Sequence, residues 1–229
     1  MPIGHKSVRP LALAALTALA TLVAEAATPG VRADDPDLAA PSPLGSVMPE
    51  VAPGAPRHHQ RIARAATLEP DAAEAIYSDL VGEMAADYAR SGLPAAREYR
   101  QWPRFNRAPY RSASHGRRFV NNYASDPRYG RFEKAGRFPV GTVVAKDSFT
   151  VTDDGHVEPG PLFLMTKMAE GFNAASGDWR YSVVMPSGEV AGVTRGENAA
   201  QVAYCIGCHL IREAYDHMYF PPPRFRVGD

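Results

Sequence analysis

Apolar residues in the middle of the chain follow a helical spacing. Between residues 69 and 90, large apolar side chains recur at intervals of four positions: Ile76, Leu80, Met84 and Tyr88. This spacing predicts an amphipathic helix that buries one stripe. Pro70 suits its first turn, and Gly92 suits its end. We therefore expect one long helix that packs against the rest of the domain.

Beyond residue 136 the pattern changes to short apolar runs separated by turn residues, which is typical of strands. The runs lie at residues 138–145, 161–168, 179–185 and 189–193. The turn residues Pro186 and Gly188 favour a hairpin between the last two runs. Residues 119–132 are expected to include helix, and residues 198–204 to form a short helical segment. The pattern predicts an α+β fold, mainly an antiparallel β-sheet with a few flanking helices.

Residues 1–26 resemble a secretory signal peptide. A basic start with Lys6 and Arg9 precedes an apolar run at residues 11–23, and Ala24 and Ala26 fit a small-x-small cleavage site. The apolar run is short for a bilayer span, although an uncleaved membrane anchor remains the alternative. We therefore expect export, with a periplasmic location for the mature protein.

Residues 27–66 contain seven prolines and few large apolar side chains. Such a stretch buries too little surface to offset its ordering entropy, so it is expected to be a disordered linker. His58 and His59 lie inside it without further ligands nearby, so no metal site is expected there. The folded domain is expected to span residues 67–229.

The composition restricts the possible partners. The formal net charge is zero, which argues against a nucleic-acid-binding protein, because such proteins carry a basic excess. Residues 94–136 are nevertheless rich in arginine. These arginines could hold carboxylates of a cofactor or dock an acidic redox partner, and the sequence does not choose between the two.

The strongest chemical signal is Cys205-Ile206-Gly207-Cys208-His209, which contains the only two cysteines of the chain. Two thiols at this spacing, followed by histidine, are typical of covalent haem attachment. The thiols can each bond one vinyl group of a porphyrin, and the histidine can then ligate the iron. We expect one haem c per chain, bound covalently through Cys205 and Cys208, with His209 as iron ligand.

The cysteine pair has two other interpretations. A thioredoxin-like redox pair favours a βαβ setting early in the domain, whereas this pair lies near the C-terminus. A structural zinc site needs four ligands, and a second cysteine pair is absent from the sequence. Haem attachment is therefore the preferred interpretation.

The other axial side of the iron, called distal here, is less well defined by the sequence. An electron-transfer haem would need a second strong ligand there, usually Met or His. The candidates are Met165, Met168, Met185, His115, His156 and His217. Only 20 residues follow His209, so the chain lacks the downstream methionine loop of small electron carriers. This order favours an open distal face.

Several stretches together resemble the cytochrome P460 family, which includes the β-type cytochromes c′. The resemblance runs over residues 99–223 and is carried by residues 138–146, 160–167 and 177–181, the haem motif and Asp216. It implies a mostly antiparallel β fold, a periplasmic location, frequent homodimers and a haem with a vacant distal site. Members of the family either oxidise hydroxylamine or bind nitric oxide or carbon monoxide.

The resemblance also implies site residues. Hydroxylamine-oxidising members carry a lysine cross-linked to the porphyrin; the alignment places Arg131 nearest to it, with Lys134 three residues away. They also carry a distal carboxylate, which falls near Ala199, with Glu197 close by. Lys134 and Glu197 are thus the weak catalytic candidates, and Lys146 is interpreted as a carboxylate partner. Aromatic residues that could cap the distal side are Phe132, Phe138, Phe149 and Phe163.

The sequence therefore predicts a mono-haem cytochrome whose open iron site handles small nitrogen species, hydroxylamine or nitric oxide. An oxidoreductase acting on hydroxylamine and a gas-binding protein both remain open. The alternative is a six-coordinate electron-transfer cytochrome c. The expected partners are a small nitrogenous ligand or diatomic gas, a redox partner protein and a second copy of the chain.

Overall fold

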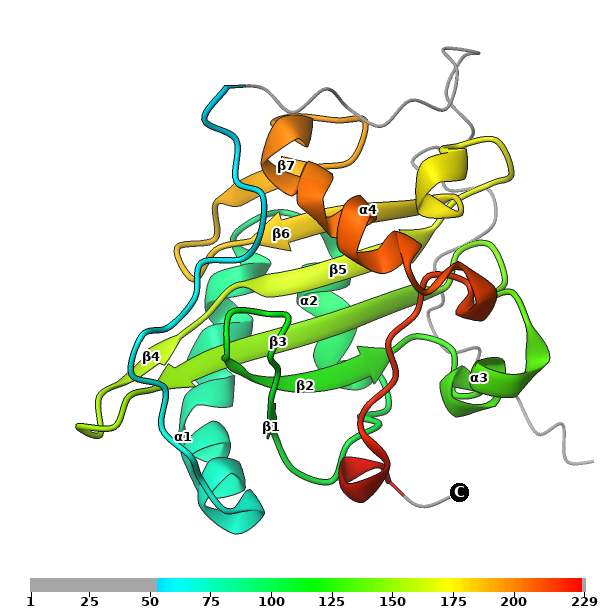
Figure 1. Cartoon of the computed structure of the whole chain (residues 1–229). Helices are drawn as coiled ribbons and strands as arrows, with labels where there is room; N and C mark the ends of the chain where they lie inside the picture. Colours follow the sequence, from blue (N-terminus) through cyan, green and yellow to red (C-terminus); the bar gives the residue numbers. More distant parts are fainter. Residues whose placement is uncertain (1–52, 228–229) are drawn as a thin grey trace, which may run out of the picture.

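The computed structural model describes residues 53–227 (Figure 1), and within them the chain forms a seven-stranded sheet whose strand pairs are all antiparallel. The strands are β1 (Tyr110–Arg111), β2 (Phe119–Ala124), β3 (Val143–Val151), β4 (Val157–Pro159), β5 (Leu162–Lys167), β6 (Trp179–Val184) and β7 (Val190–Val193). Their order is β1-β2-β3-β5-β6-β7, with β4 paired to β3. The predicted α+β fold class is confirmed.

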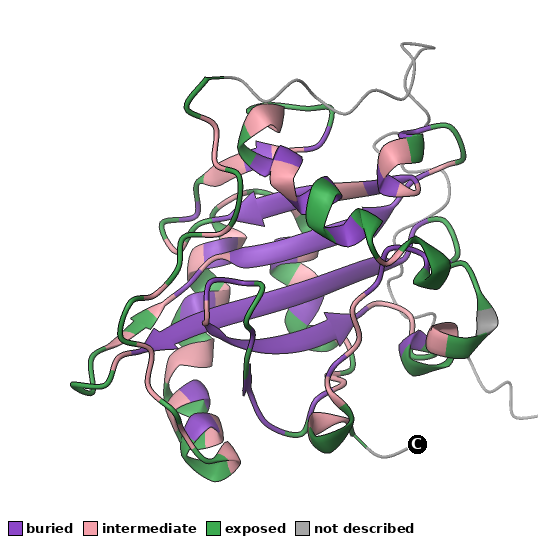
Figure 2. Ribbon diagram, in the orientation of Figure 1, coloured by how far each residue is buried: buried purple, intermediate pink, exposed green. Residues whose placement is uncertain are grey.

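Helices cover both faces of this sheet. The α-helices are α1 (Pro70–Ala89), α2 (Pro94–Glu98), α3 (Phe132–Ala135) and α4 (Ala203–Leu210). Short 3₁₀ helices are η2 (Tyr99–Gln101), η3 (Tyr129–Arg131), η4 (Ala174–Ser176), η5 (Ala199–Val202), η6 (Glu213–Tyr215) and η7 (Pro223–Phe225). In Figure 1, α1 lies behind the sheet and α4 crosses in front of it. The central strands are consequently buried on both sides (Figure 2), and every residue of β3 and β5 is buried.

The predicted helix at residues 69–90 is confirmed as α1. Its buried stripe contains Tyr77, Met84 and Tyr88, which pack on one face of the sheet with Phe149 and Leu164. The hairpin at residues 179–193 is confirmed as β6 and β7. No helix within residues 53–227 is long and apolar enough to span a membrane.

Two expected elements differ from the structure. Residues 119–124 form the buried strand β2, where helix was expected, because they pair along their whole length with β3. The strand expected from residue 138 starts instead at Val143. Before it, Gly141 has a positive φ of 86° and the amide of Thr142 donates to the carbonyl of Pro139 at 3.1 Å, so a turn precedes the strand.

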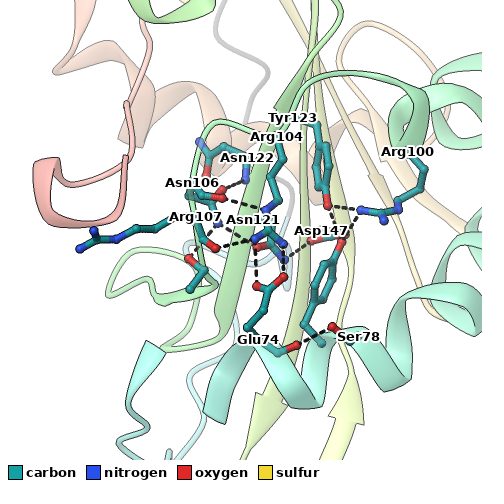
Figure 3. A network of polar contacts seen from close by, with 12 residues as sticks. Glu74, Ser78, Arg100, Arg104, Asn106, Arg107, Asn121, Asn122, Tyr123 and Asp147 are labelled. Carbon is teal, nitrogen blue, oxygen red and sulfur yellow. Dashed lines mark hydrogen bonds and ion pairs between the residues drawn. The ribbon is translucent and has the colours of Figure 1, made fainter. Parts of the chain in front are cut away.

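A buried polar network joins α1 to the sheet (Figure 3). The Asp147 carboxylate on β3 accepts hydrogen bonds from Tyr77 Oη at 2.5 Å and Asn121 Nδ2 at 3.0 Å. Tyr77 Oη also lies 2.6 Å from Tyr123 Oη, and Arg100 donates to both hydroxyls. Burial raises the pKa of Asp147, against the opposing effect of these hydrogen bonds. The network thus gives a buried carboxylate the partners it needs.

The chain before α1 lies against the sheet. The amide of Ile62 donates to the carbonyl of Gly116 at 2.9 Å, and the amide of Ala66 donates to that of Val151 at 2.8 Å. The carbonyl of Arg64 accepts from the amide of Asp153 at 2.8 Å. The last part of the expected linker, residues 62–66, is thus hydrogen-bonded to the sheet and its loops. The expected signal peptide and residues 27–52 lie outside the described residues.

Candidate functional site

The motif Cys205-Ile206-Gly207-Cys208-His209 lies on α4, the short helix that crosses the sheet. Residues three and four apart share one face of a helix, so Cys205, Cys208 and His209 point the same way. All three line a cavity between α4 and the sheet. The helix thus presents two free thiols and an imidazole to this cavity.

The walls of the cavity are mostly apolar and aromatic, with a few polar groups. The lining residues besides the motif come from the sheet, the β1–β2 loop, the segment before α1 and the segment after α4: His59, Ser114, His115, Asn122, Val144, Lys146, Phe163, Leu164, Met165, Tyr181, Ser182, Val183, Met218 and Tyr219. This lining, among the described residues, contains no carboxylate.

His209 is held in one orientation. Its Nδ1 lies 2.6 Å from the backbone carbonyl of His217, and a carbonyl can only accept, so Nδ1 carries the proton. The rings of Tyr181 and Tyr219 pack edge-on against the imidazole, each with centroids 5.2 Å away. Burial lowers the pKa of His209 to about 3. The imidazole is therefore neutral, with the lone pair on Nε2 available to a metal.

The carbonyl that orients His209 belongs to a tightly fixed turn. Asp216 and His217 both have positive φ, 51° and 61°. The Asp216 carboxylate accepts from Lys167 Nζ at 2.6 Å and from the amide of Phe138 at 2.8 Å. Its backbone carbonyl accepts from Trp179 Nε1 at 2.8 Å. Three partners thus converge on this turn and fix the position of the His217 carbonyl.

Lys146 enters the cavity from β3. Side chains alternate along a strand, so Lys146 points to the α4 side while its neighbour Asp147 joins the network under α1. Lys146 is buried, and this burial lowers the pKa of its amine to about 8. The cavity therefore contains an amine that loses its proton more easily than an ordinary lysine.

A second aromatic group forms another part of the wall. The His59 ring stacks on His115 with centroids 4.8 Å apart, and it meets Phe163 at 4.7 Å and Tyr204 at 4.8 Å. None of these ring contacts involves His209, so the two groups form separate parts of the cavity wall.

The structure brings together Cys205, Cys208 and His209, the predicted attachment residues. Lys134 on α3 and Glu197 before η5 are both exposed, and neither lines the cavity. The candidate cross-linking and carboxylate positions are thus not in the cavity, whereas Lys146, interpreted as a carboxylate partner, is.

The candidate distal ligands also divide into residues that line the cavity and residues that do not. Met165 and His115 line the cavity. The others do not: Met168 packs with Phe172, Met185 is 36% exposed, the exposed His156 pairs with Glu158, and the His217 ring lies outside the lining.

Of the four phenylalanines considered as caps, Phe163 alone lines the cavity. Phe132 and Phe138 pack against each other with centroids 4.3 Å apart, and Phe149 packs on the α1 side.

Sequence reasoning does not identify Tyr181 or His59 as cavity residues. Tyr181 lies within residues 177–181, a stretch that carries only the family resemblance. His59 falls in the expected linker, and its contact with His115 depends on how the chain before α1 packs. The alternation along β3 was a usable signal for Lys146, because adjacent charged residues in a buried strand must face opposite sides.

The cavity fits a haem. Tyr181 Oη is buried, faces the cavity and has no hydrogen-bond partner in the part of the chain that the structure describes, so it awaits a partner that the protein does not supply. The two thiols, the free lone pair of His209 and the apolar walls match the needs of a covalently bound porphyrin. Within residues 53–227, no group of three His, Cys, Asp or Glu side chains could hold a bare metal ion.

An antiparallel β-sheet with a helix that carries two cysteines and a histidine across one face is consistent with a haem-binding cytochrome domain. The chain belongs to the cytochrome P460 family, whose sequence model matches residues 96–220. Membership implies a haem cofactor. A comparison with curated protein sequences gives no match.

Proposed function

We propose that the protein is a periplasmic mono-haem cytochrome whose iron is open on its distal side to small nitrogen species, hydroxylamine or nitric oxide. The observation that carries this proposal is the hydrogen bond from His209 Nδ1 to the His217 carbonyl, next to two thiols on the same cavity. It leaves Nε2 of a neutral imidazole with a lone pair that can ligate the haem iron.

Covalent attachment follows from the position of the thiols. Each S–H would add across one porphyrin vinyl group, so that a carbon–sulfur bond would form and the proton would go to the other vinyl carbon. Cys205 and Cys208 are one helical turn apart and face the same cavity. The bound haem supplies reversible one-electron chemistry and an iron coordination site.

The protein's own side chains set what reaches that site. The Phe163 ring and the stacked rings of His59 and His115 narrow the part of the cavity that lies away from His209. A cavity narrowed in this way admits small molecules and excludes large ones. Lys146 is the cavity lysine, and its lowered pKa, about 8, leaves a fraction of neutral amine at neutral pH. We therefore propose that Lys146, and not Lys134, is the lysine that lies next to the porphyrin.

The second candidate is a six-coordinate electron-transfer cytochrome. It is favoured by Met165 and His115, which both line the cavity and are of the two residue types that serve as second axial ligands. A low-spin spectrum that does not respond to carbon monoxide would support it.

The deciding experiment is optical spectroscopy of the full chain matured with c-type haem. Spectra of the oxidised and reduced protein are recorded before and after addition of nitric oxide and of hydroxylamine. A red-shifted reduced Soret band, with hydroxylamine consumed in the presence of an oxidant, identifies an enzyme. A high-spin spectrum that responds to nitric oxide alone identifies a gas-binding cytochrome. Absence of Soret absorbance after maturation overturns the proposal.

Export, pairing with a second copy of the chain and docking of a redox partner remain proposals. Fractionation of the expressing cells and sedimentation of the purified protein test the first two. Salt-dependent reduction by an acidic electron donor tests whether the arginine-rich residues 94–136 form the docking face.

A further inference from the structure

The cavity lacks the carboxylate expected from Glu197, and this leaves open which group exchanges hydrogen bonds with a bound ligand. Glu197 is exposed, and none of the described lining residues is Asp or Glu. The cavity contains three basic side chains apart from the motif: Lys146, His115 and His59.

His115 is placed by its own loop between β1 and β2. Its Nδ1 lies 3.0 Å from Ser112 Oγ and 3.2 Å from Ser114 Oγ. A hydroxyl can rotate to donate or to accept, so either tautomer of His115 keeps its Nδ1 bonded. Nε2 has no hydrogen-bond partner among the described residues, and it is therefore free to donate in one tautomer and to accept in the other.

The segment before α1 completes this part of the wall. Its residues 60–62 dock on the β1–β2 loop: Arg118 Nη1 donates to the Gln60 carbonyl at 2.9 Å, and the amide of Ile62 donates to the Gly116 carbonyl at 2.9 Å. A Cβ on Gly116 would lie 2.1 Å from the Gln60 oxygen, so this close approach requires glycine. The docked segment lays the His59 ring on His115.

His59 is fixed on its other side by α4. Its Nδ1 lies 3.0 Å from Tyr204 Oη, next to the first cysteine of the haem motif. Burial, Arg118, Lys146 and His58 together lower the pKa of His59 to about 4, and burial lowers the pKa of His115 well below its usual value. Both rings are therefore neutral at pH 7, so each has one ring nitrogen that donates and one that accepts a hydrogen bond.

We propose that His115, held in place by the stacked His59, hydrogen-bonds through Nε2 to the small molecule bound at the haem iron. The inference rests on the proposed function, since it needs a haem held by His209. It assigns to an imidazole the ligand contact that the missing carboxylate would make. The Nε2 atom of His115 can donate in one tautomer and accept in the other. It can therefore pair with ligands such as hydroxylamine, which carry donors and acceptors on adjacent atoms.

The test uses full-length protein with covalent haem and two probes, carbon monoxide for the ferrous form and cyanide for the ferric form. His115→Phe should shift the C–O stretching frequency upward and weaken cyanide binding about 2- to 10-fold, the range of one hydrogen bond. His115→Gln, which keeps a donor, should restore part of the effect. His156→Phe is the matched control, since His156 is exposed and remote from the cavity.

The outcomes separate this inference from the proposed function. An unchanged stretch and unchanged cyanide affinity in haem-loaded His115→Phe overturn the hydrogen bond while the open site stands. A low-spin wild type that becomes high-spin in His115→Phe shows that His115 ligates iron, which overturns both. If His115→Phe does not fold, His59→Leu on the docked segment replaces it, and a C–O shift in the same direction is expected.

Discussion

His209 Nδ1 and the backbone carbonyl of His217 are 2.6 Å apart, and the carbonyl belongs to a turn in which two consecutive residues have positive φ. The imidazole orientation is therefore set by backbone eight residues further along the chain. That backbone is in turn held by the buried ion pair of Lys167 and Asp216.

Asp216→Asn tests how strongly this ion pair holds the turn. Asparagine tolerates positive φ, so the change removes the charge without adding backbone strain. Lys167 would be left buried without its counter-ion, and the free energy of unfolding should fall by about 3–5 kcal/mol. Urea unfolding measures it. Glu158→Gln, in an exposed pair with His156, should cost roughly 0–1 kcal/mol, and equal losses in the two variants would contradict the prediction.

Lys146→Met tests the cavity lysine. Methionine fills similar space without a charge, so the unfolding free energy of the haem-free protein at pH 7 should rise by about 1–3 kcal/mol, because burial disfavours the ammonium. In haem-loaded protein, any red-shifted Soret band and hydroxylamine consumption should disappear. Lys134→Met, on the exposed surface, should leave both unchanged. Loss of these signals in Lys134→Met alone would reverse the assignment.

His59 contributes to the pH dependence of the free energy of unfolding. Its pKa in the folded protein is about 4, below the unfolded value of ~6.5, so the unfolded chain binds the proton first. The contribution is complete above the unfolded pKa and is lost as pH falls toward the folded pKa. Haem-free protein should lose up to about 3 kcal/mol between pH 6.5 and 4 through this group. His59→Gln should reduce this change of unfolding free energy with pH, measured by chemical denaturation, whereas His156→Gln should not.

Gly116→Ala tests the docking of the segment before α1. The added Cβ would overlap the Gln60 carbonyl, and alanine at the positive φ of 71° is strained. The segment should detach, and trypsin should cleave after Arg61 and Arg64 several-fold faster than in the wild type. Gly130→Ala is the control, because nothing lies within 4 Å of its Cβ position. Equal cleavage rates in all three proteins would mean that the segment is not held by this contact.

The local parts of the site were predictable from the sequence. The spacing of Cys205, Cys208 and His209 places them on one helix face whatever the rest of the fold does. The long helix and the β6–β7 hairpin were also predictable, since their periodicity and turn residues are local signals.

The parts that depend on distant partners were not predictable. Residues 119–124 read as helix because nothing local reveals that they pair with β3. Lys134 and Lys146 differ in role because Lys134 is exposed on the short helix α3, whereas Lys146 lies in a central strand that is covered on both faces. His59 reaches the cavity because the residues that follow it, Gln60 and Ile62, are hydrogen-bonded to Arg118 and Gly116, which are far away in the sequence.

The neighbouring residues Lys146 and Asp147 give β3 a fixed register. Their side chains enter two separate compartments, the cavity under α4 and the tyrosine network under α1. A one-residue insertion or deletion in this strand would exchange them. The carboxylate would then lose its tyrosine donors, and the ammonium would replace the acceptor at the centre of that network. We therefore expect an insertion or deletion to be tolerated in the loops at either end of β3 and not within the strand.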